Sequence, residues 1–255
     1  MNYPFGEKVK KVEQIDKSWK KYFVLGVYAS AVHAKWIGSD NKVKVKALAV
    51  ASEPEIFWRG NQKEAKQIIT KIQIPSEIGR LQPAAPSFNG PSGIELDESY
   101  LKPLGLTRDD VWLCDLLPYS RLNDGQLKAI KREYEPIEKK FNLPKVTLEK
   151  VPSRFCNERR LEEIKEELEN SGADTIILLG DIPIKEFANK FDNKYRRLSD
   201  FKEYGELHEI EIDDKNYQLL PLVHPRQAGK LGRSNHKWFQ LHQDWIKRKE
   251  KESGI

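Results

Sequence analysis

Residues 174–184 read DTIILLGDIPI, and this stretch decides the fold class. A short, uninterrupted apolar run that ends in Gly-Asp and is soon followed by proline is typical of a buried parallel strand leading into a helix. Three runs resemble the strand at Asp174–Leu179; they are Tyr22–Tyr28 (YFVLGVY), Val111–Leu117 (VWLCDLL) and Tyr217–Val223 (YQLLPLV). Because helical patterns separate the four runs, we predict an α/β fold: a three-layer α-β-α sandwich around a central, mainly parallel four-stranded sheet.

The flanking segments are predicted from their caps and periodicity. Asn157 is expected to cap a helix that Gly172 ends, and Val43–Ala51 alternates like an edge strand or hairpin arm. Ser234 is expected to cap a last helix. That helix packs an apolar face on the core, formed by Trp238, Leu241 and Trp245. No repeat or linker divides the chain, so we predict one domain over residues 1–255.

Both ends of the chain are basic. The net charge is +5 over 255 residues. Residues 1–48 hold ten Lys/Arg against four acids, and residues 224–255 hold eight against three. Basic segments folded onto one face form a phosphate-binding surface, and the alternative is a solubilising terminal helix.

The sequence argues against several protein classes. No apolar run is long enough to cross a membrane, and the lysine-rich N-terminus lacks the apolar core of a secretory signal. The two cysteines, Cys114 and Cys156, are too few for a metal cage or a disulfide framework. We therefore expect a reduced, cytoplasmic protein that uses no metal or cofactor, binds no membrane and is a monomer.

Polar side chains close several of the predicted strands. Ligands of open parallel sheets bind at the carboxyl ends of the strands, where Asp115, Asp181 and His224 fall. Asp181 is also explained as a helix cap, and a lone histidine is often structural. A basic loop with two glycines, Pro225–Arg233, follows His224 and suits a phosphate backbone.

A glycine-containing turn precedes the second strand. Residues 88–97 read FNGPSGIELD, and Gly90 and Gly93 allow a tight start to a helix near Gly93. Such a turn presents Phe88 and free backbone amides to the strand ends. The alternative is a simple turn at the start of a helix.

These pieces, in this order, resemble the uracil-DNA glycosylase superfamily. They are the glycine-ended first strand, the FNGPSG turn, GLTRDDVWLCDLLPYSR (Gly105–Arg121), IILLGDIPI (Ile176–Ile184) and PLVHPRQAGKLGRS (Pro221–Ser234), spanning roughly residues 22–245. The resemblance implies DNA as partner, a base flipped into a pocket, and hydrolysis of its N-glycosidic bond to leave an abasic site.

The resemblance also implies residue roles. Phe88 matches the aromatic on which the base stacks. Asp115 stands where the family has an asparagine that reads the base, and His224 matches the histidine that stabilises charge on the departing base. The loop after His224 matches the one that presses into the minor groove.

This chain departs from the family at several positions. Val27 and Tyr28 replace the acid or amide that positions water, and the usual proline is Ala29. Ser30 stands where a bulky residue crowds the pyrimidine 5-position. The loop has Ala228 where the wedge leucine is expected, with Leu231 three residues later. Two cysteines also exclude the iron–sulphur branch of the family.

The departures suggest a particular base. An ionised Asp115 accepts a hydrogen bond from the N4 amino group of cytosine. Uracil has a carbonyl at that position, and two acceptors that face each other cost about 1–3 kcal/mol. Small residues at Ala29 and Ser30 leave room at C5. We therefore predict a C5-modified cytosine, hydroxymethylated or glucosylated as in phage DNA, and a role in anti-phage defence. A protonated Asp115 would restore uracil reading, so a uracil-excising repair enzyme is the alternative.

The candidate residues fall into three groups. The catalytic candidates are His224, Asp115, Tyr28, Ser30 and His33. The base-binding candidates are Phe88, Asp115, Gly26 and Ala29. The DNA-binding candidates are Pro91, Ser92, Gly93, Arg226, Gln227, Lys230, Leu231 and Arg233. His236 and His242 are expected to be surface or structural.

A non-catalytic single-strand or damaged-DNA binding protein is the alternative from another class. A nucleotide-binding hydrolase ranks third, because phosphate-loop motifs are absent.

Overall fold

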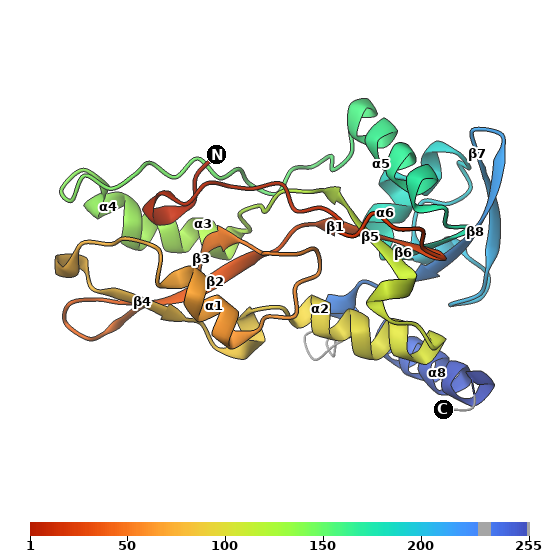
Figure 1. The fold of residues 1–255 in the computed structure, drawn as a ribbon, viewed down its shortest axis with the longest axis horizontal. Coiled ribbons are helices and arrows are strands. Elements are labelled where there is room, and N and C mark those ends of the chain that lie inside the picture. The colour runs from red at the N-terminus through yellow and green to blue at the C-terminus, as the bar shows by residue number, and fades with distance from the viewer. Residues whose placement is uncertain (229–235, 254–255) are drawn as a thin grey trace. The chain divides into compact units, whose positions relative to one another are not determined.

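A five-stranded sheet carries the larger part of the fold in a computed structural model that describes residues 1–228 and 236–253 (Figure 1). Its strand order is β5-β1-β6-β8-β7. The strands are β1 Tyr22–Tyr28, β5 Val111–Leu117, β6 Thr175–Leu179, β7 His208–Ile212 and β8 Lys215–Leu222. All four predicted strands are present, and the α/β class is confirmed.

The strands of this sheet run mainly parallel. Phe23, Ile176 and Leu219 lie side by side in the parallel strands β1, β6 and β8, and all three are fully buried. The backbone N–H of Lys21 donates to the Asp110 carbonyl at 3.1 Å, so β1 and β5 also begin next to each other. The carboxyl ends of β5, β1, β6 and β8 therefore share one edge of the sheet.

The prediction of four strands was wrong by one, because β7 adds an antiparallel edge strand. β7 pairs with β8 through a tight hairpin whose two turn residues, Asp213 and Asp214, both have positive φ. Its sequence, HEIEI, alternates and buries only Ile210 and Ile212. A search for continuous apolar runs passes over such a strand.

Helices flank the sheet on both sides (Figure 1). Helix α5, Glu158–Ser171, begins as predicted, since the Asn157 side chain accepts a hydrogen bond from Arg160 N. It ends at Gly172, whose φ is +71°. Helix α8, His236–Ser253, lies on the other side of the sheet and buries Trp245, with Trp238 and Leu241 partly buried. The predicted cap, Ser234, lies outside the described residues.

Asp181 does not cap a helix as expected. Gly180 occupies the capping position of α6, Asp181–Glu186, and Asp181 is the first helical residue. Its carboxylate instead accepts a hydrogen bond from the backbone N–H of Leu198 at 2.7 Å. The prediction was wrong because Gly180, with φ +92°, supplies the turn that a capping side chain usually supports.

A second, antiparallel sheet has the order β3-β2-β4. Its strands are β2 Ala31–Ile37, β3 Val43–Ser52 and β4 Arg80–Pro83. The strand predicted at Val43–Ala51 is β3, at the edge of this sheet, while β2 and β4 were not predicted. Helices α1 Gln62–Ile69, α3 Asp124–Ala129 and α4 Glu135–Glu138 accompany it. Its core includes Trp36, Leu48 and Tyr134.

The chain packs into two compact units. The small-sheet unit comprises Met1–Val12, Tyr28–Gly93 and Tyr119–Ser153, and the large-sheet unit comprises Glu13–Val27, Ile94–Pro118 and Arg154–Ile255.

Two short α-helices are α2 Pro91–Leu96 and α7 Pro225–Ala228. The remaining helical segments are η1 Pro4–Gly6, η2 Ser76–Ile78, η3 Pro86–Phe88, η4 Asp97–Leu101, η5 Lys102–Leu104, η6 Arg108–Asp110, η7 Ile130–Tyr134, η8 Ala188–Lys190 and η9 Leu198–Asp200. Among the described residues, none of the helices combines the length and apolarity that a membrane crossing requires.

The cap of α5 gives a first stability prediction. Asn157→Ala removes the hydrogen bond to Arg160 N and should lower the free energy of unfolding by about 1 kcal/mol. Arg159→Ala, at a highly exposed position on the same helical turn, should change it by only a few tenths. Urea unfolding of both variants is the measurement, and equal losses would contradict the capping role.

Candidate functional site

Asp115 is a buried carboxyl on β5, near the shared carboxyl edge of the large sheet. Its residue is 4% exposed, and none of the described residues donates a hydrogen bond to its side chain. Burial raises the pKa of Asp115 to about 7; Arg160 opposes this shift and Glu167 adds to it. A buried carboxyl without a protein partner is costly, and such groups are concentrated in functional sites.

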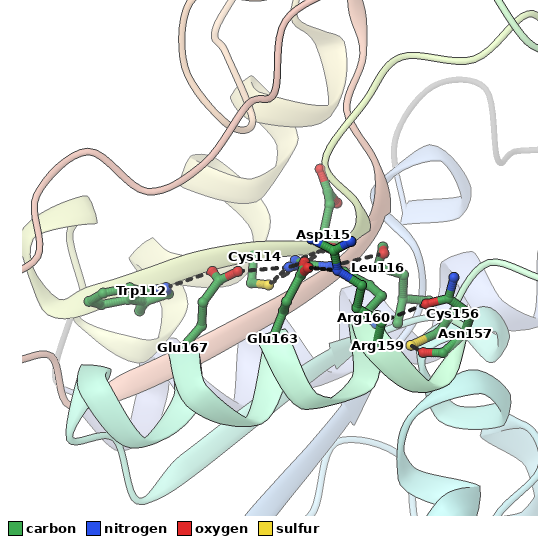
Figure 2. Close-up of polar contacts among 10 residues, drawn as sticks. All are labelled: Trp112, Cys114, Asp115, Leu116, Cys156, Asn157, Arg159, Arg160, Glu163 and Glu167. Carbon is green, nitrogen blue, oxygen red and sulfur yellow. Dashed lines mark hydrogen bonds and ion pairs between the residues drawn. The ribbon is translucent and has the colours of Figure 1, made fainter.

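Arg160 lies beneath the strand that carries Asp115 (Figure 2). Its Nη2 donates to the Asp115 carbonyl at 2.8 Å and to Cys114 Sγ at 3.2 Å, and its Nε donates to the Leu116 carbonyl at 3.2 Å. Figure 2 shows the Asp115 carboxyl pointing away from α5 and from this guanidinium. Arg160 therefore holds the Asp115 backbone, and its carboxyl has no hydrogen-bond partner among residues 1–228 and 236–253.

Two glutamates on α5 engage the same guanidinium. Arg160 Nη1 lies 2.9 Å from Glu167 Oε1 and 3.2 Å from Glu163 Oε2. Glu167 also accepts a hydrogen bond from Trp112 Nε1 at 3.3 Å. The charge of Arg160 is thus largely balanced on its own helix, which explains why burial still dominates the pKa of Asp115.

His224 follows β8 at the same edge of the sheet. Its Nδ1 accepts a hydrogen bond from Arg226 N at 3.1 Å, so the neutral ring carries its proton on Nε2. Burial lowers the pKa of His224 to about 4, and the charge of Arg226 lowers it further. Within the described residues Nε2 has no hydrogen-bond partner. His224 is therefore a neutral donor available to a ligand.

Gly180 allows His224 to lie against the end of β6. Gly180 N donates to the Leu222 carbonyl at 2.7 Å, which joins the ends of β6 and β8. A Cβ on Gly180 would lie 3.0 Å from His224 Cβ, in a backbone conformation that side chains rarely adopt. The Gly-Asp pair that ends the third predicted strand thus makes room for the histidine.

A hydrogen-bonded chain fixes the backbone just before His224. Val223 N donates to the Tyr204 hydroxyl at 3.1 Å, and the Val223 carbonyl accepts from the Tyr100 hydroxyl at 2.7 Å. Tyr204 bonds His242 Nδ1 at 2.6 Å, and His242 Nε2 donates to the Ser99 carbonyl at 3.0 Å. His242 is fully buried in this chain, in agreement with the predicted structural role.

Other candidates belong to the small-sheet unit. Ser30 N donates to Glu53 Oε1 at 2.9 Å, and the Ser120 hydroxyl donates to the Ser30 carbonyl. The Asn89 side chain accepts from His33 N at 2.8 Å and donates to the His33 carbonyl at 3.1 Å. Burial lowers the pKa of His33 to about 4. Phe88 is 44% exposed.

The glycines of the FNGPSG turn serve close backbone packing. A Cβ on Gly90 would lie 2.1 Å from Gly60 N, and one on Gly93 would lie 2.1 Å from the Phe57 carbonyl. Helix α2 begins at Pro91, so the predicted start near Gly93 was two residues late. Packing against residues 57–60 accounts for the glycines without a ligand.

The candidate residues divide between the two units. Gly26, Asp115 and His224 belong to the large-sheet unit, as do the exposed Arg226 and the partly buried Gln227. The small-sheet unit holds Tyr28, Ala29, Ser30, His33, Phe88, Pro91, Ser92 and Gly93. Lys230, Leu231 and Arg233 lie outside the described residues.

The sequence search missed the residues that support the site. Arg160 stands four residues before Ile164, on the buried face of a helix whose cap was predicted. A charged residue on an apolar helical face is a signal for a buried ion pair. Tyr204 and Asn89 carry no comparable signal, since their partners are far away in the sequence.

The basic residues of α8 are mostly paired. Lys247 lies 3.9 Å from Asp244, Arg248 lies 2.8 Å from Glu206, and Lys249 lies 2.8 Å from Glu252. These pairs favour the solubilising interpretation of this helix over a phosphate-binding surface.

Comparison with protein-family models and with curated protein sequences finds no match for this chain. In the part of the chain that the structure describes, no cluster of three or more His, Cys, Asp or Glu side chains could hold a metal ion. Asp115 and His224 therefore have to be interpreted from their own geometry.

The raised pKa of Asp115 predicts a pH-dependent cost to stability. The folded-state pKa of Asp115 lies above the unfolded value near 3.9. The free energy of unfolding is therefore highest below about pH 4 and falls as the pH rises to about 7. Asp115→Asn cannot ionise, and at pH 8 it should be more stable than the wild type by on the order of 2–4 kcal/mol. Denaturant unfolding at pH 8 and pH 4.5 tests this. A difference of equal size at both pH values would contradict it.

The geometry of His224 predicts its tautomer. We expect ¹⁵N NMR to show a neutral ring with the proton on Nε2 at pH 6, because burial keeps the ring uncharged until the pH approaches 4. His224→Ala assigns the signal. A doubly protonated ring at pH 6 would contradict the arrangement.

Proposed function

We propose that the protein is a monofunctional DNA glycosylase, which hydrolyses the N-glycosidic bond of a base and leaves an abasic site. One observation carries the proposal. A buried carboxyl, which receives no hydrogen bond from the described residues, and a neutral imidazole donor lie at the same edge of a mainly parallel sheet. This pair suits the polar edges of an uncharged ring such as a nucleobase.

The proposed role of His224 follows from the charge that the reaction creates. When the glycosidic bond breaks, its electron pair leaves with the base and negative charge grows on a carbonyl oxygen of the base. A donor fixed in advance at that position stabilises the transition state. The Nε2–H of His224 is such a donor, held by the Arg226 N–H and by Gly180. A neutral imidazole is able to polarise a developing oxyanion.

The proposed role of Asp115 is to recognise the base. β1 and β6 separate β5 from β8, so the two backbones lie roughly 14 Å apart at the usual strand spacing. Asp115 and His224 are therefore too far apart to bond each other, and each is left for a ligand. An ionised carboxyl accepts from the amino group of cytosine, and a protonated one donates to the carbonyl of uracil.

We propose a cytosine with a C5 substituent as the substrate, with uracil as the alternative. The ionised Asp115 complements an amino group, and the sequence places the small residues Ala29 and Ser30 after β1. Anti-phage defence is the role that such a substrate implies. The group that activates water stays a prediction among Tyr28, Ser30 and His33.

Base release from matched oligonucleotides tests this proposal. The DNAs carry uracil, cytosine, 5-hydroxymethylcytosine or glucosylated 5-hydroxymethylcytosine, as single strands and as duplexes, and alkali-sensitive breakage reports abasic sites. We expect release from a modified cytosine and none from cytosine. His224→Ala should lower the rate by about 10²–10³-fold, because it removes a transition-state donor. Asp115→Asn should remove discrimination between the bases.

Arg159→Ala serves as the surface control and should keep the wild-type rate. Release from uracil alone would identify a repair enzyme that uses a protonated Asp115. DNA binding without release from any substrate would contradict the glycosylase proposal and favour a non-catalytic single-strand or damaged-DNA binding protein.

A further inference from the structure

We infer that Glu167, through its ion pair with Arg160, decides whether Asp115 meets its ligand as a hydrogen-bond donor or as an acceptor. Glu167 is then a positioning residue that sets substrate choice from the far side of the sheet. The inference rests on the proposed function, since it concerns which base that site accepts.

The geometry links Glu167 to Asp115 through one guanidinium. Arg160 donates to the Asp115 carbonyl at 2.8 Å and is held by Glu167 at 2.9 Å, so the peptide of Asp115 and the Glu167 carboxylate share a partner. The Asp115 carboxyl points to the opposite side of β5 (Figure 2). Glu167 therefore acts on Asp115 through its charge, without touching the ligand.

The two glutamates that pair with Arg160 are not equivalent. The Glu167 side chain is 17% exposed and is also held by Trp112 Nε1, whereas Glu163 is 35% exposed. Water screens a charge less as it becomes more buried. Glu167 raises the pKa of Asp115.

The charged groups that act on the Asp115 carboxyl are Arg160 and Glu167, both on α5. Cys114, next to it on β5, is a neutral thiol because burial raises its pKa well above the usual value. The neighbouring strand β1 has no titratable residue between Tyr22 and Tyr28. Burial is the main cause of the raised pKa of Asp115, and the balance between this cation and this anion adjusts it.

Removing the charge of Glu167 has a defined consequence. Glu167→Gln removes a negative charge that balances the Arg160 guanidinium. The pKa of Asp115 therefore falls, and its ionised form persists to lower pH. At neutral pH the variant should favour a base with an amino group and disfavour one with a carbonyl group. Glu163→Gln should have a smaller effect, since that side chain is more exposed.

The experiment measures the pH profile of base release, from pH 5 to 9, for 5-hydroxymethylcytosine and uracil in the same DNA. The pH at which the two rates are equal should fall by about one pH unit in Glu167→Gln. It should move much less in Glu163→Gln. Glu167→Asp keeps the charge and changes the fit, so its profile should stay close to the wild type.

A second readout does not depend on activity. Selective ¹³C labelling of aspartate carboxyls, assigned with Asp115→Asn, follows the titration of Asp115 directly in each variant. Its midpoint should fall in Glu167→Gln and be retained in Glu167→Asp. An unchanged midpoint in a folded Glu167→Gln, or equal shifts in Glu167→Gln and Glu163→Gln, overturns the inference. If Glu167→Gln does not fold, a second neutral variant, Glu167→Ser, takes its place: a lowered midpoint supports the inference and an unchanged one overturns it. Absence of base release from the wild type overturns the proposed function alone, because the titration still decides the role of Glu167.

Discussion

The large-sheet unit depends on a buried guanidinium. Arg160 is buried beneath β5, and a charge removed from water is tolerated only when all its hydrogen-bond donors have acceptors. Two carbonyls and a thiol on β5 and two carboxylates on α5 satisfy it. The same contacts fix α5 to the strand and hold the backbone of Asp115. A hydrophobic residue at position 160 would pack, but it would not fix the carbonyls of residues 115 and 116.

Burial acts on the two main site residues in opposite directions with the same result. It raises the pKa of Asp115 to about 7 and lowers that of His224 to about 4. Each group thereby loses charge near neutral pH. Such an edge favours an uncharged polar ligand over a phosphate, which is why the proposal gives these residues the base. Phosphate contacts would have to come from other residues of the chain.

The sequence predicted the elements whose signals are local. Continuous runs such as Val111–Leu117 identify buried parallel strands, and Asn157 with Gly172 identifies the ends of α5. β7 was missed because an edge strand buries only alternate residues. Asp181 was misassigned because the left-handed Gly180 takes the place of a side-chain cap. In each case a local pattern had two structural solutions, and contacts distant in the sequence chose between them.

The candidate site also combines features that have a local sequence signal with features that depend on distant contacts. Asp115 and His224 became candidates because each falls at or near the end of a recognisable strand. Their chemical states were not found, because those depend on partners brought in by the fold: Arg160 and Glu167 from α5 for one, and burial against Gly180 for the other. In the sequence, Asp115 looks like a plain hydrogen-bond acceptor. In the structure it is a carboxyl whose proton depends on a helix on the other face of the sheet. Under the proposed function, β5 and α5 together would determine which base Asp115 accepts.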